Sequence, residues 1–391
     1  MSVGRKRAAR RPRVCFVALG AYPLFDRNVP AEIGGMEVRS SLFARGLARR
    51  GQWDVWFLVR DLGQPARQRI GDVTVAVYPD HQFSCQTYEP GINALYGEIA
   101  ADVYVGFGVN WLTAEVVRSS QRYGAQSVLC TASEVDLDEQ YRSGSSYRSL
   151  GGEFGNACHY AITQSDRVVV QTARQQTLAA DRFGVEASII RSPIELPRRS
   201  ARRSPPSPLR RYMFWVGRSD ALKRPLLALE LARRLPDVPF LLVMNPSDAA
   251  MHDEVERRLL PNVLTTERIP FDRMSQLFHD AAGLVSTSLV EGFPNVFLQA
   301  GAHGVPVMSL QADPDALLRS GGGRVARGDL DRLTRDIAQI WADPSAADAE
   351  RQYLWQYLHA HHALDRRAGE LDAVLHEVFA DVPRRRSRAA A

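Results

Sequence analysis

An arginine and a lysine stand five positions apart in residues 216–224, which read VGRSDALKR. A β-branched and aromatic run precedes them, so Arg218 and Lys223 are expected at the carboxyl end of a strand, where parallel α/β sheets bind ligands. Only two of the 49 basic residues are lysines. A lysine at this position therefore indicates a compact ammonium directed at a phosphate. The alternative interpretation is a solvated charge at the start of a helix, which the apolar spacing predicts over residues 222–235.

A second motif, EGFPNVFLQ, occupies residues 291–299 and follows another predicted strand. Pro294 suits the first turn of a helix, so the free amides of residues 292–296 would face the carboxyl edge of the sheet and bind an anion. Glu291 would precede this helix, and Gln299 would lie about one and a half turns into it. The alternative is that Pro294 begins an ordinary packed helix beside a solvated Glu291.

Two polar segments in the first half of the chain are expected at the same kind of sheet edge. Residues 34–37 read GGME between a strand and a helix, which is an anion-binding shape but a weak signal alone. Residues 131–138 read TASEVDLD after another strand. Their candidates for binding a polar acceptor are Ser133, Glu134 and Asp136. A hydrated loop is the equally open alternative.

The elements that must position these motifs alternate between short β-branched runs and helical patterns, first over residues 13–191 and again from residue 212. Residues 194–211 lack an apolar period and contain four prolines, which indicates a linker. The sequence therefore predicts an α/β protein with two facing Rossmann-like domains. The predicted parts are a basic disordered tail (1–12), an acceptor domain (13–195), a linker (196–211), a donor domain (212–344), C-terminal helices packing back across the interdomain cleft (345–380) and a basic tail (381–391).

The positive charge of the chain is concentrated in three short stretches. Residues 1–13, 198–211 and 384–391 hold 16 of the 49 basic residues, which leaves 33 basic against 44 acidic residues elsewhere. The folded body is therefore acidic, and we expect no nucleic-acid binding. The tails could make peripheral contact with anionic membranes, or they could be solvated ends.

The four cysteines form no CxxC pair, and no stretch reaches the roughly 18 to 20 apolar residues needed to cross a bilayer. Residues 14–21 follow basic residues, but no small-residue cleavage pattern follows them, so we interpret them as a strand rather than a signal peptide. These features predict a cytoplasmic protein, with the inner membrane face as an optional location. The chain has no GxGxxG, Walker or GxSxG motif, which removes the main support for dehydrogenases, P-loop NTPases and α/β-hydrolases.

These motifs together resemble family 4 of the retaining glycosyltransferases, which have the GT-B fold. The resemblance covers about residues 13–380 and is densest over residues 214–310. It implies that Arg218 and Lys223 hold the donor diphosphate and that Glu291 contacts the donor sugar, which makes these three the expected catalytic residues. The positions that it implies for donor binding are Gly34, Gly35, Gly217, Gly292, Phe293, Pro294, Asn295 and Gln299.

Two positions depart from the family pattern. Gln299 stands where the family has a second glutamate, so it would accept a ribose hydroxyl with one oxygen and without charge. Many relatives carry a histidine beside the reacting sugar at the end of the strand that here reads SVLCTAS, and Thr131 or Ser133 stands there instead.

The resulting expectation is a hexosyltransferase that moves a sugar from a nucleoside-diphosphate sugar to a hydroxyl acceptor, in glycan, polysaccharide or glycolipid biosynthesis. No metal or other cofactor is expected, because the two cations and a helix dipole can stabilise the leaving diphosphate. Two alternatives stay open: a GT-B relative that acts on the nucleotide sugar itself, such as an epimerase, and a protein that binds a nucleotide sugar or glycan without turnover.

Overall fold

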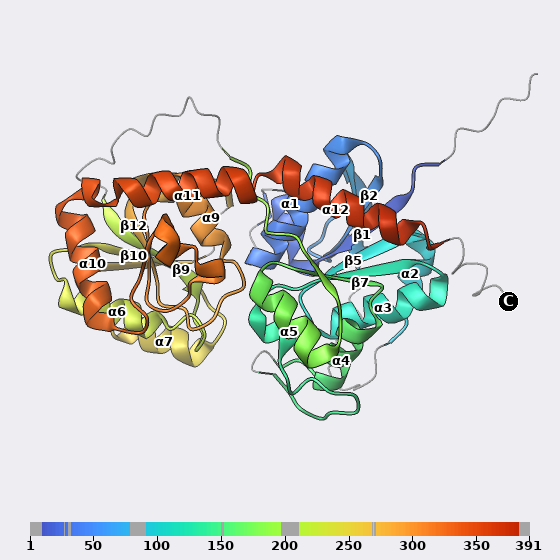
Figure 1. Cartoon of the computed structure of the whole chain (residues 1–391), viewed down its shortest axis with the longest axis horizontal. Helices are drawn as coiled ribbons and strands as arrows, with labels where there is room; N and C mark the ends of the chain where they lie inside the picture. Colours follow the sequence, from blue (N-terminus) through green and yellow to red (C-terminus); the bar gives the residue numbers. More distant parts are fainter. Residues whose placement is uncertain are drawn as a thin grey trace, which may run out of the picture.

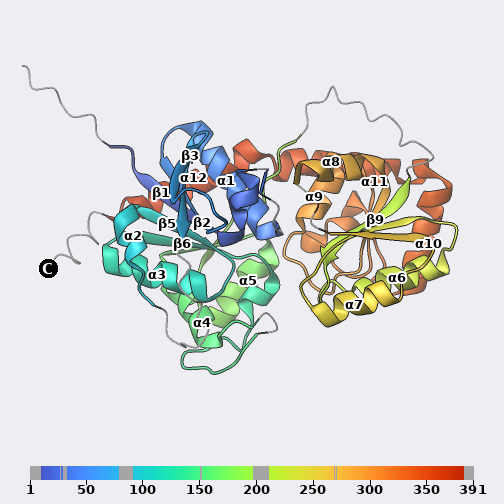
Figure 2. The same cartoon turned by 180° about the vertical axis from the view of Figure 1, so that it is seen from behind.

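The chain forms two α/β domains that lie side by side, as Figures 1 and 2 show from opposite sides. The computed structural model describes residues 10–26, 28–29, 33–78, 91–149, 152–196, 211–267, 269 and 271–382. Within these residues there are two sheets, one of eight strands and one of six. The sequence-based prediction of two Rossmann-like domains is confirmed.

The first sheet has the strand order β3-β4-β2-β1-β5-β6-β7-β8, and every pair is parallel except β3 with β4. Its strands are β1 (Arg13–Val17), β2 (Asp54–Arg60), β3 (Arg67–Ile70), β4 (Val73–Tyr78), β5 (Val103–Phe107), β6 (Gln126–Cys130), β7 (Arg167–Val170) and β8 (Ala187–Ile189). The strand order reverses between β1 and β5, which is the place where open α/β sheets bind ligands. The loop after β1 therefore starts at the expected ligand-binding edge.

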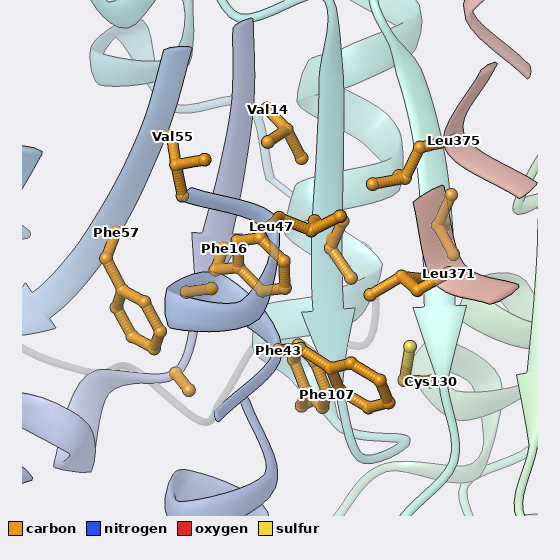
Figure 3. Packing of buried hydrophobic residues seen from close by; sticks show 14 of the residues in the cluster. Val14, Phe16, Phe43, Leu47, Val55, Phe57, Phe107, Cys130, Leu371 and Leu375 are labelled. Atoms are coloured by element: carbon orange, nitrogen blue, oxygen red, sulfur yellow. The ribbon is translucent and has the colours of Figure 1, made fainter. Parts of the chain in front are cut away.

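The helices of this domain are η1 (Leu19–Leu24), α1 (Gly35–Arg50), α2 (Ala94–Ile99), α3 (Trp111–Tyr123), η2 (Glu134–Leu137), α4 (Gly155–Gln164) and α5 (Ala173–Phe183). Helix α1 follows β1 and ends at Gly51, whose φ of 69° lies in the left-handed region that favours glycine. Phe43 and Leu47 of α1 pack on Phe16 of β1 and Phe57 of β2 (Figure 3). This packing fixes the direction of α1, so that its amino end lies at the carboxyl edge of the sheet.

The second sheet has the order β11-β10-β9-β12-β13-β14 and is parallel throughout. Its strands are β9 (Tyr212–Arg218), β10 (Phe240–Asn245), β11 (Val263–Thr266), β12 (Ala281–Ser286), β13 (Val307–Ser309) and β14 (Arg324–Val325). Its helices are α6 (Pro225–Arg234), α7 (Ala249–Arg257), α8 (Phe271–Asp280), α9 (Asn295–Ala302), η4 (Pro314–Ala316), η5 (Leu318–Gly322), α10 (Leu330–Ala342) and η6 (Pro344–Ala347). The central neighbours β9 and β12 carry the two motifs that the sequence singles out.

The last two helices divide between the domains. Helix α11 (Asp348–His361) packs on α9 of the second domain, whereas α12 (Leu364–Phe379) packs on α1 of the first (Figure 1). Leu371 and Leu375 of α12 belong to the same core cluster as the α1 side chains (Figure 3). The C-terminal segment thus completes the core of a domain that begins more than 300 residues earlier.

The chain crosses between the domains twice, and the two crossings pair with each other. Ile194 and Ala363 form a parallel β-bridge, in which the amide of Ile194 donates to the carbonyl of His362 at 2.8 Å. The ring of His362 is buried and its Nδ1 lies 2.7 Å from the carbonyl oxygen of Ser192. The junction between the domains is therefore tied down by backbone and side chain together.

Several predicted segments lie largely or wholly outside the described residues. These are the two basic tails and almost all of the predicted linker, of which residues 1–9, 383–391 and 197–210 are not described. In the described part of the chain, no helix combines the length and the apolar character needed to span a membrane.

Candidate functional site

The two motifs of the second domain meet in an ion pair. The Nζ atom of Lys223, after β9, contacts the Oε1 atom of Glu291, after β12. Only 22% of the Lys223 side chain and 14% of the Glu291 side chain are exposed. Because β9 and β12 are adjacent and parallel, residues 68 positions apart reach the same sheet edge. A largely buried lysine at this edge of the sheet agrees with a site for an anionic ligand. Such a ligand would compete with Glu291 for the Lys223 ammonium.

A tight turn over residues 219–224 positions Lys223. The Oδ1 atom of Asp220 accepts hydrogen bonds from the amides of Leu222 at 3.0 Å and Lys223 at 2.8 Å, and its Oδ2 lies 2.9 Å from Arg218. Helix α6 begins only at Pro225, three residues later than the predicted start at Leu222. The physical reason is that the Asp220 side chain satisfies the amides that a helix would use, and proline favours the first helical position.

Arg224 ties this turn to the neighbouring strand, a role that no sequence motif indicated. Its backbone is left-handed, with φ at 52°, and its Nε donates to the carbonyl of Thr287 at 2.6 Å. The hydroxyl of Thr287 in turn donates to the carbonyl of Lys223 at 2.7 Å. Such a strained, over-determined backbone at a sheet edge is typical of functional sites. The lysine is consequently held on a rigid frame.

The loop over residues 291–294 packs directly against the first domain. A Cβ atom placed on Gly292 would lie 2.4 Å from the carbonyl oxygen of Ala132, so only glycine fits there. Phe293 is buried, and its ring centroid lies 4.4 Å from that of His362 at the domain junction. The motif that was predicted to bind the donor therefore also carries a contact between the domains.

Helix α9 starts one residue later than expected, because Pro294 adopts an extended conformation and serves as the N-cap. The Asn295 side chain donates to the carbonyl of Gly35 in the first domain at 2.6 Å. Gln299 lies one turn further along the same face of α9, is partly buried, and has no side-chain hydrogen bond to the described residues. Its amide is thus available on the side of α9 that faces the first domain.

Glu37 takes up the space beside the predicted glycine loop of the first domain, a position that sequence reasoning missed. Its Oε2 atom lies 2.5 Å from the place where a Cβ on Gly34 would be. A Cβ on Gly35 would lie 2.9 Å from the Nδ2 atom of Asn295. The two glycines therefore make room for protein side chains, one from each domain.

The predicted acceptor residues lie on the loop after β6. Asp136 accepts a hydrogen bond from the amide of Ala132 at 2.6 Å, and burial raises the pKa of its carboxyl to about 6. Glu134 pairs with Arg174 of α5 at 2.8 Å, and Ser133 lies against Gly292. The structure brings Ser133 to the domain contact, whereas Asp136 mainly holds its own loop together.

Two buried polar side chains support this loop from below, and no motif pointed to them. Arg39 of α1 donates to the carbonyl of Thr131 at 2.6 Å and to that of Ile190 at 3.1 Å. The Oε1 atom of Gln175 accepts a hydrogen bond from the Thr131 hydroxyl at 3.0 Å, and its buried Nε2 has no hydrogen-bond partner among the described residues. Arg39 and Gln175 lie in helices that carry many other polar residues. Nothing in the sequence therefore distinguishes these two buried side chains from solvent-exposed ones.

A cavity in the described part of the chain lies elsewhere. It measures about 630 Å³ and is lined by residues between β14, α10 and α11, among them Arg319, Arg324, Arg327 and Arg332. No predicted site residue lines it. The candidate site is thus not this cavity. It consists of the residues joined by the Lys223–Glu291 ion pair and by hydrogen bonds where the carboxyl edges of the two sheets face each other. Among the described residues, no three His, Cys, Asp or Glu side chains gather as a metal site would require.

Comparison with known proteins finds a family match over part of the chain and structures that share its fold. The family described as "Glycosyl transferases group 1" matches residues 210–343, about a third of the chain. Among curated protein sequences, none matches the chain.

Solved structures with low identity share the fold over almost the whole chain. Sucrose-phosphate synthase from Thermosynechococcus elongatus has 16% identity and a TM-score of 0.75, covering 95% of this chain and 100% of its own. Anabaena HepE in complex with UDP and glucose has 14% identity and a TM-score of 0.66, covering 94% and 100%. The trehalose-6-phosphate synthase OtsA has 12% identity and a TM-score of 0.70, covering 93% and 98%. The predicted GT-B fold is confirmed.

Proposed function

We propose that the protein is a retaining glycosyltransferase of family 4 that moves a hexosyl group from a nucleoside-diphosphate sugar to a hydroxyl acceptor. The observation that carries the proposal is the contact between Lys223 and Glu291 at the carboxyl ends of adjacent parallel strands. The match of residues 210–343 to a glycosyltransferase family covers both residues. A glycan, polysaccharide or glycolipid is the proposed product class.

The proposed chemistry is stabilisation of a leaving diphosphate. As the bond from the sugar to phosphate breaks, negative charge grows on the phosphate oxygens, and fixed cations next to them lower the barrier. Arg218 is 57% exposed and can swing from Asp220 to such an oxygen, while Lys223 is already held in place. The amino end of α9 adds its dipole. These charges fill the role that a metal ion has in other transferases, so we propose that none is needed.

The other groups divide between sugar, ribose and acceptor. Once the diphosphate binds Lys223, the Glu291 carboxylate is released to accept hydroxyls of the transferred sugar. Gln299 lies on the same helix face as Asn295, with no side-chain hydrogen bond to the part of the chain that the structure describes, and is proposed to bind the ribose. The loop with Ser133 and Glu134 is proposed to face the acceptor, whose hydroxyl attacks from the side of the departing phosphate and gives up its proton to it.

The proposal is tested with a panel of nucleoside-diphosphate sugars, in the presence of EDTA, by following release of the nucleoside diphosphate and transfer to added glycans and glycolipids. Arg218→Met and Lys223→Met should each lower kcat by about a hundredfold to a thousandfold with the cognate donor. Arg257→Met is the control, because Arg257 lies in α7 and pairs with Glu254 outside the site.

Near-full activity of the Lys223→Met variant, or a strict need for Mg²⁺ or Mn²⁺, would contradict the proposed mechanism. Conversion of the donor sugar without any acceptor would instead identify an enzyme that acts on the nucleotide sugar itself. We also propose that the protein works in the cytoplasm, where nucleotide sugars are present, with its arginine-rich tails as the means of approaching an anionic membrane.

A further inference from the structure

Glu37 sits in a cradle formed by two glycines from different segments of the first domain. Its Oε1 atom lies 3.0 Å from the place of a Cβ on Gly20, which belongs to η1 after β1, and its Oε2 lies 2.5 Å from that of a Cβ on Gly34. Any other residue at Gly34 would displace the carboxylate. The two loops are thus shaped around this one side chain, at the point where the strand order of the first sheet reverses.

The carboxylate folds back onto the amino end of its own helix. Glu37 is the third residue of α1, and the backbone amides of Gly34 and Glu37 stabilise its charge, as in one half of a capping box. Burial nevertheless raises the pKa of the Glu37 carboxyl, while Arg60 at the end of β2 and Arg218 from the second domain lower it. The side chain keeps part of its surface exposed, and the hydrogen bond from Asn295 to the carbonyl of Gly35 brings the second domain up to this end of α1.

This arrangement reverses the charge that the amino end of α1 shows to a ligand. A bare helix amino end with glycines attracts anions, but here Glu37 already uses those amides, and the carbonyl of Gly35 is occupied by Asn295. A second anion at this position would meet a carboxylate. The groups that a carboxylate in this setting recognises are hydroxyl donors.

We propose that Glu37 is a substrate-binding residue whose carboxylate accepts a hydrogen bond from a sugar hydroxyl, opposite the diphosphate held by Arg218 and Lys223. The inference rests on the proposed function and adds a specificity determinant to it from the first domain. The hydroxyl belongs either to the transferred sugar or to a sugar of the acceptor, and the two sources are separated by the test.

The test compares Glu37→Gln with the wild-type protein, using the full chain and the cognate donor and acceptor. Glutamine keeps the size of the side chain and an oxygen for the helix cap but loses the charge. Losing a charge-assisted hydrogen bond should lower kcat/KM by roughly tenfold to a hundredfold. Asp329→Asn is the matched control, since Asp329 caps α10 through the amide of Arg332, away from the facing edges.

Deoxy analogues of the donor sugar and of the acceptor identify the contacted hydroxyl. Wild type should lose about the same tenfold to hundredfold with one analogue, and Glu37→Gln should show no further loss with that analogue. If the effective analogue is a donor, Glu37 binds the transferred sugar, and if it is an acceptor, Glu37 binds the acceptor. Equal sensitivity of the two proteins to every analogue would overturn the proposal.

Binding of the nucleoside diphosphate alone separates this inference from the proposed function. Affinity for the diphosphate should stay within about threefold in Glu37→Gln, because the sugar is absent from this ligand. A large loss would overturn the inference in favour of a role in positioning Arg218. If the wild-type protein bound no nucleoside diphosphate and transferred no sugar, the proposed function would fail instead. Transfer by Glu37→Gln within threefold of the wild-type rate would refute the inference while leaving the function intact.

Discussion

Replacing Lys223 by methionine should damage folding as well as activity, because its partner Glu291 is mostly shielded from water. Methionine preserves the apolar stem of the side chain but leaves the Glu291 carboxylate, 14% exposed, without its cation. Leaving a buried charged group unpaired costs about 1–3 kcal/mol, and more when desolvation is complete. The ion pair is partly hydrated, so we expect the free energy of unfolding to fall by about 1–2 kcal/mol. Urea unfolding in the absence of ligand measures this loss.

A double-mutant cycle isolates the interaction. Glu291→Gln removes the charge on the other side, and the Lys223→Met, Glu291→Gln double variant should be destabilised by about 1 kcal/mol less than the sum of the single variants. Arg218→Met is the internal comparison: its side chain is 57% exposed, so the free energy of unfolding should change by less than about 0.5 kcal/mol. The expected result therefore separates two cations that activity alone would treat alike.

Additive effects in this cycle, within about 0.3 kcal/mol, would show that the two side chains are not coupled in solution. The reasoning that the strand order forces the two motifs together would then be refuted. A saturating nucleoside diphosphate supplies a further comparison, because it should raise the unfolding free energy of wild type more than that of Lys223→Met.

Three further outcomes follow from the site. Gly292→Ala should push the domains apart, because a Cβ would lie 2.4 Å from the Ala132 carbonyl oxygen. Small-angle scattering should then show a larger radius of gyration, and sugar transfer should be lost. An unchanged radius of gyration and transfer rate would contradict the contact. Asp136→Asn should remove a pH dependence, because burial raises the pKa of Asp136 from 3.8 to about 6 in the folded protein. Relative to the variant, wild type should lose about 2 kcal/mol of unfolding free energy as the pH rises from 4 to 6, and urea unfolding curves that shift equally for both proteins over that range would refute this. Gln299→Glu should lower KM for the donor several-fold, because a carboxylate accepts the ribose hydroxyls more strongly than an amide. Gln299→Ala should no longer distinguish a 2′,3′-dideoxyribose donor from the normal donor. Equal discrimination by wild type and Gln299→Ala would show that Gln299 does not contact the ribose.

The α/β alternation could be predicted because its strands are apolar and its helices are closed by glycines, as at Gly51 after α1. Parallel strands then bring Lys223 and Glu291 to one edge without any further information. Strand β3, with the sequence RQRI, escaped prediction because it lies at the edge of the sheet, where exposed polar residues are tolerated. Strand β14 has only two residues, too few to form a pattern.

Details of the site depended on contacts that no local pattern encodes. The Asp220 turn delays α6 because a single side chain competes with helical hydrogen bonds, and the sequence could have indicated this through the aspartate shortly before Pro225. Arg224 and Glu37 take their positions from partners on other strands and loops. A charged residue's burial and orientation are set by the assembled fold, so its role becomes visible only there.

The docking of α12 on the first domain has a consequence for the order in which the protein is made. Trp53 donates through Nε1 to the carboxylate of Asp372 at 2.8 Å, and Leu371 and Leu375 fill the core above the first sheet. The ribosome synthesises residues 13–189 of that sheet long before these side chains exist. Until translation reaches α12, the nascent first domain has an apolar surface over α1 and a buried indole without its acceptor. The second domain can fold in the meantime, so the core of the first domain, which is synthesised first, is completed last. Premature termination before residue 364 would therefore release a protein whose defect lies in the first domain, at the opposite end of the sequence from the missing segment.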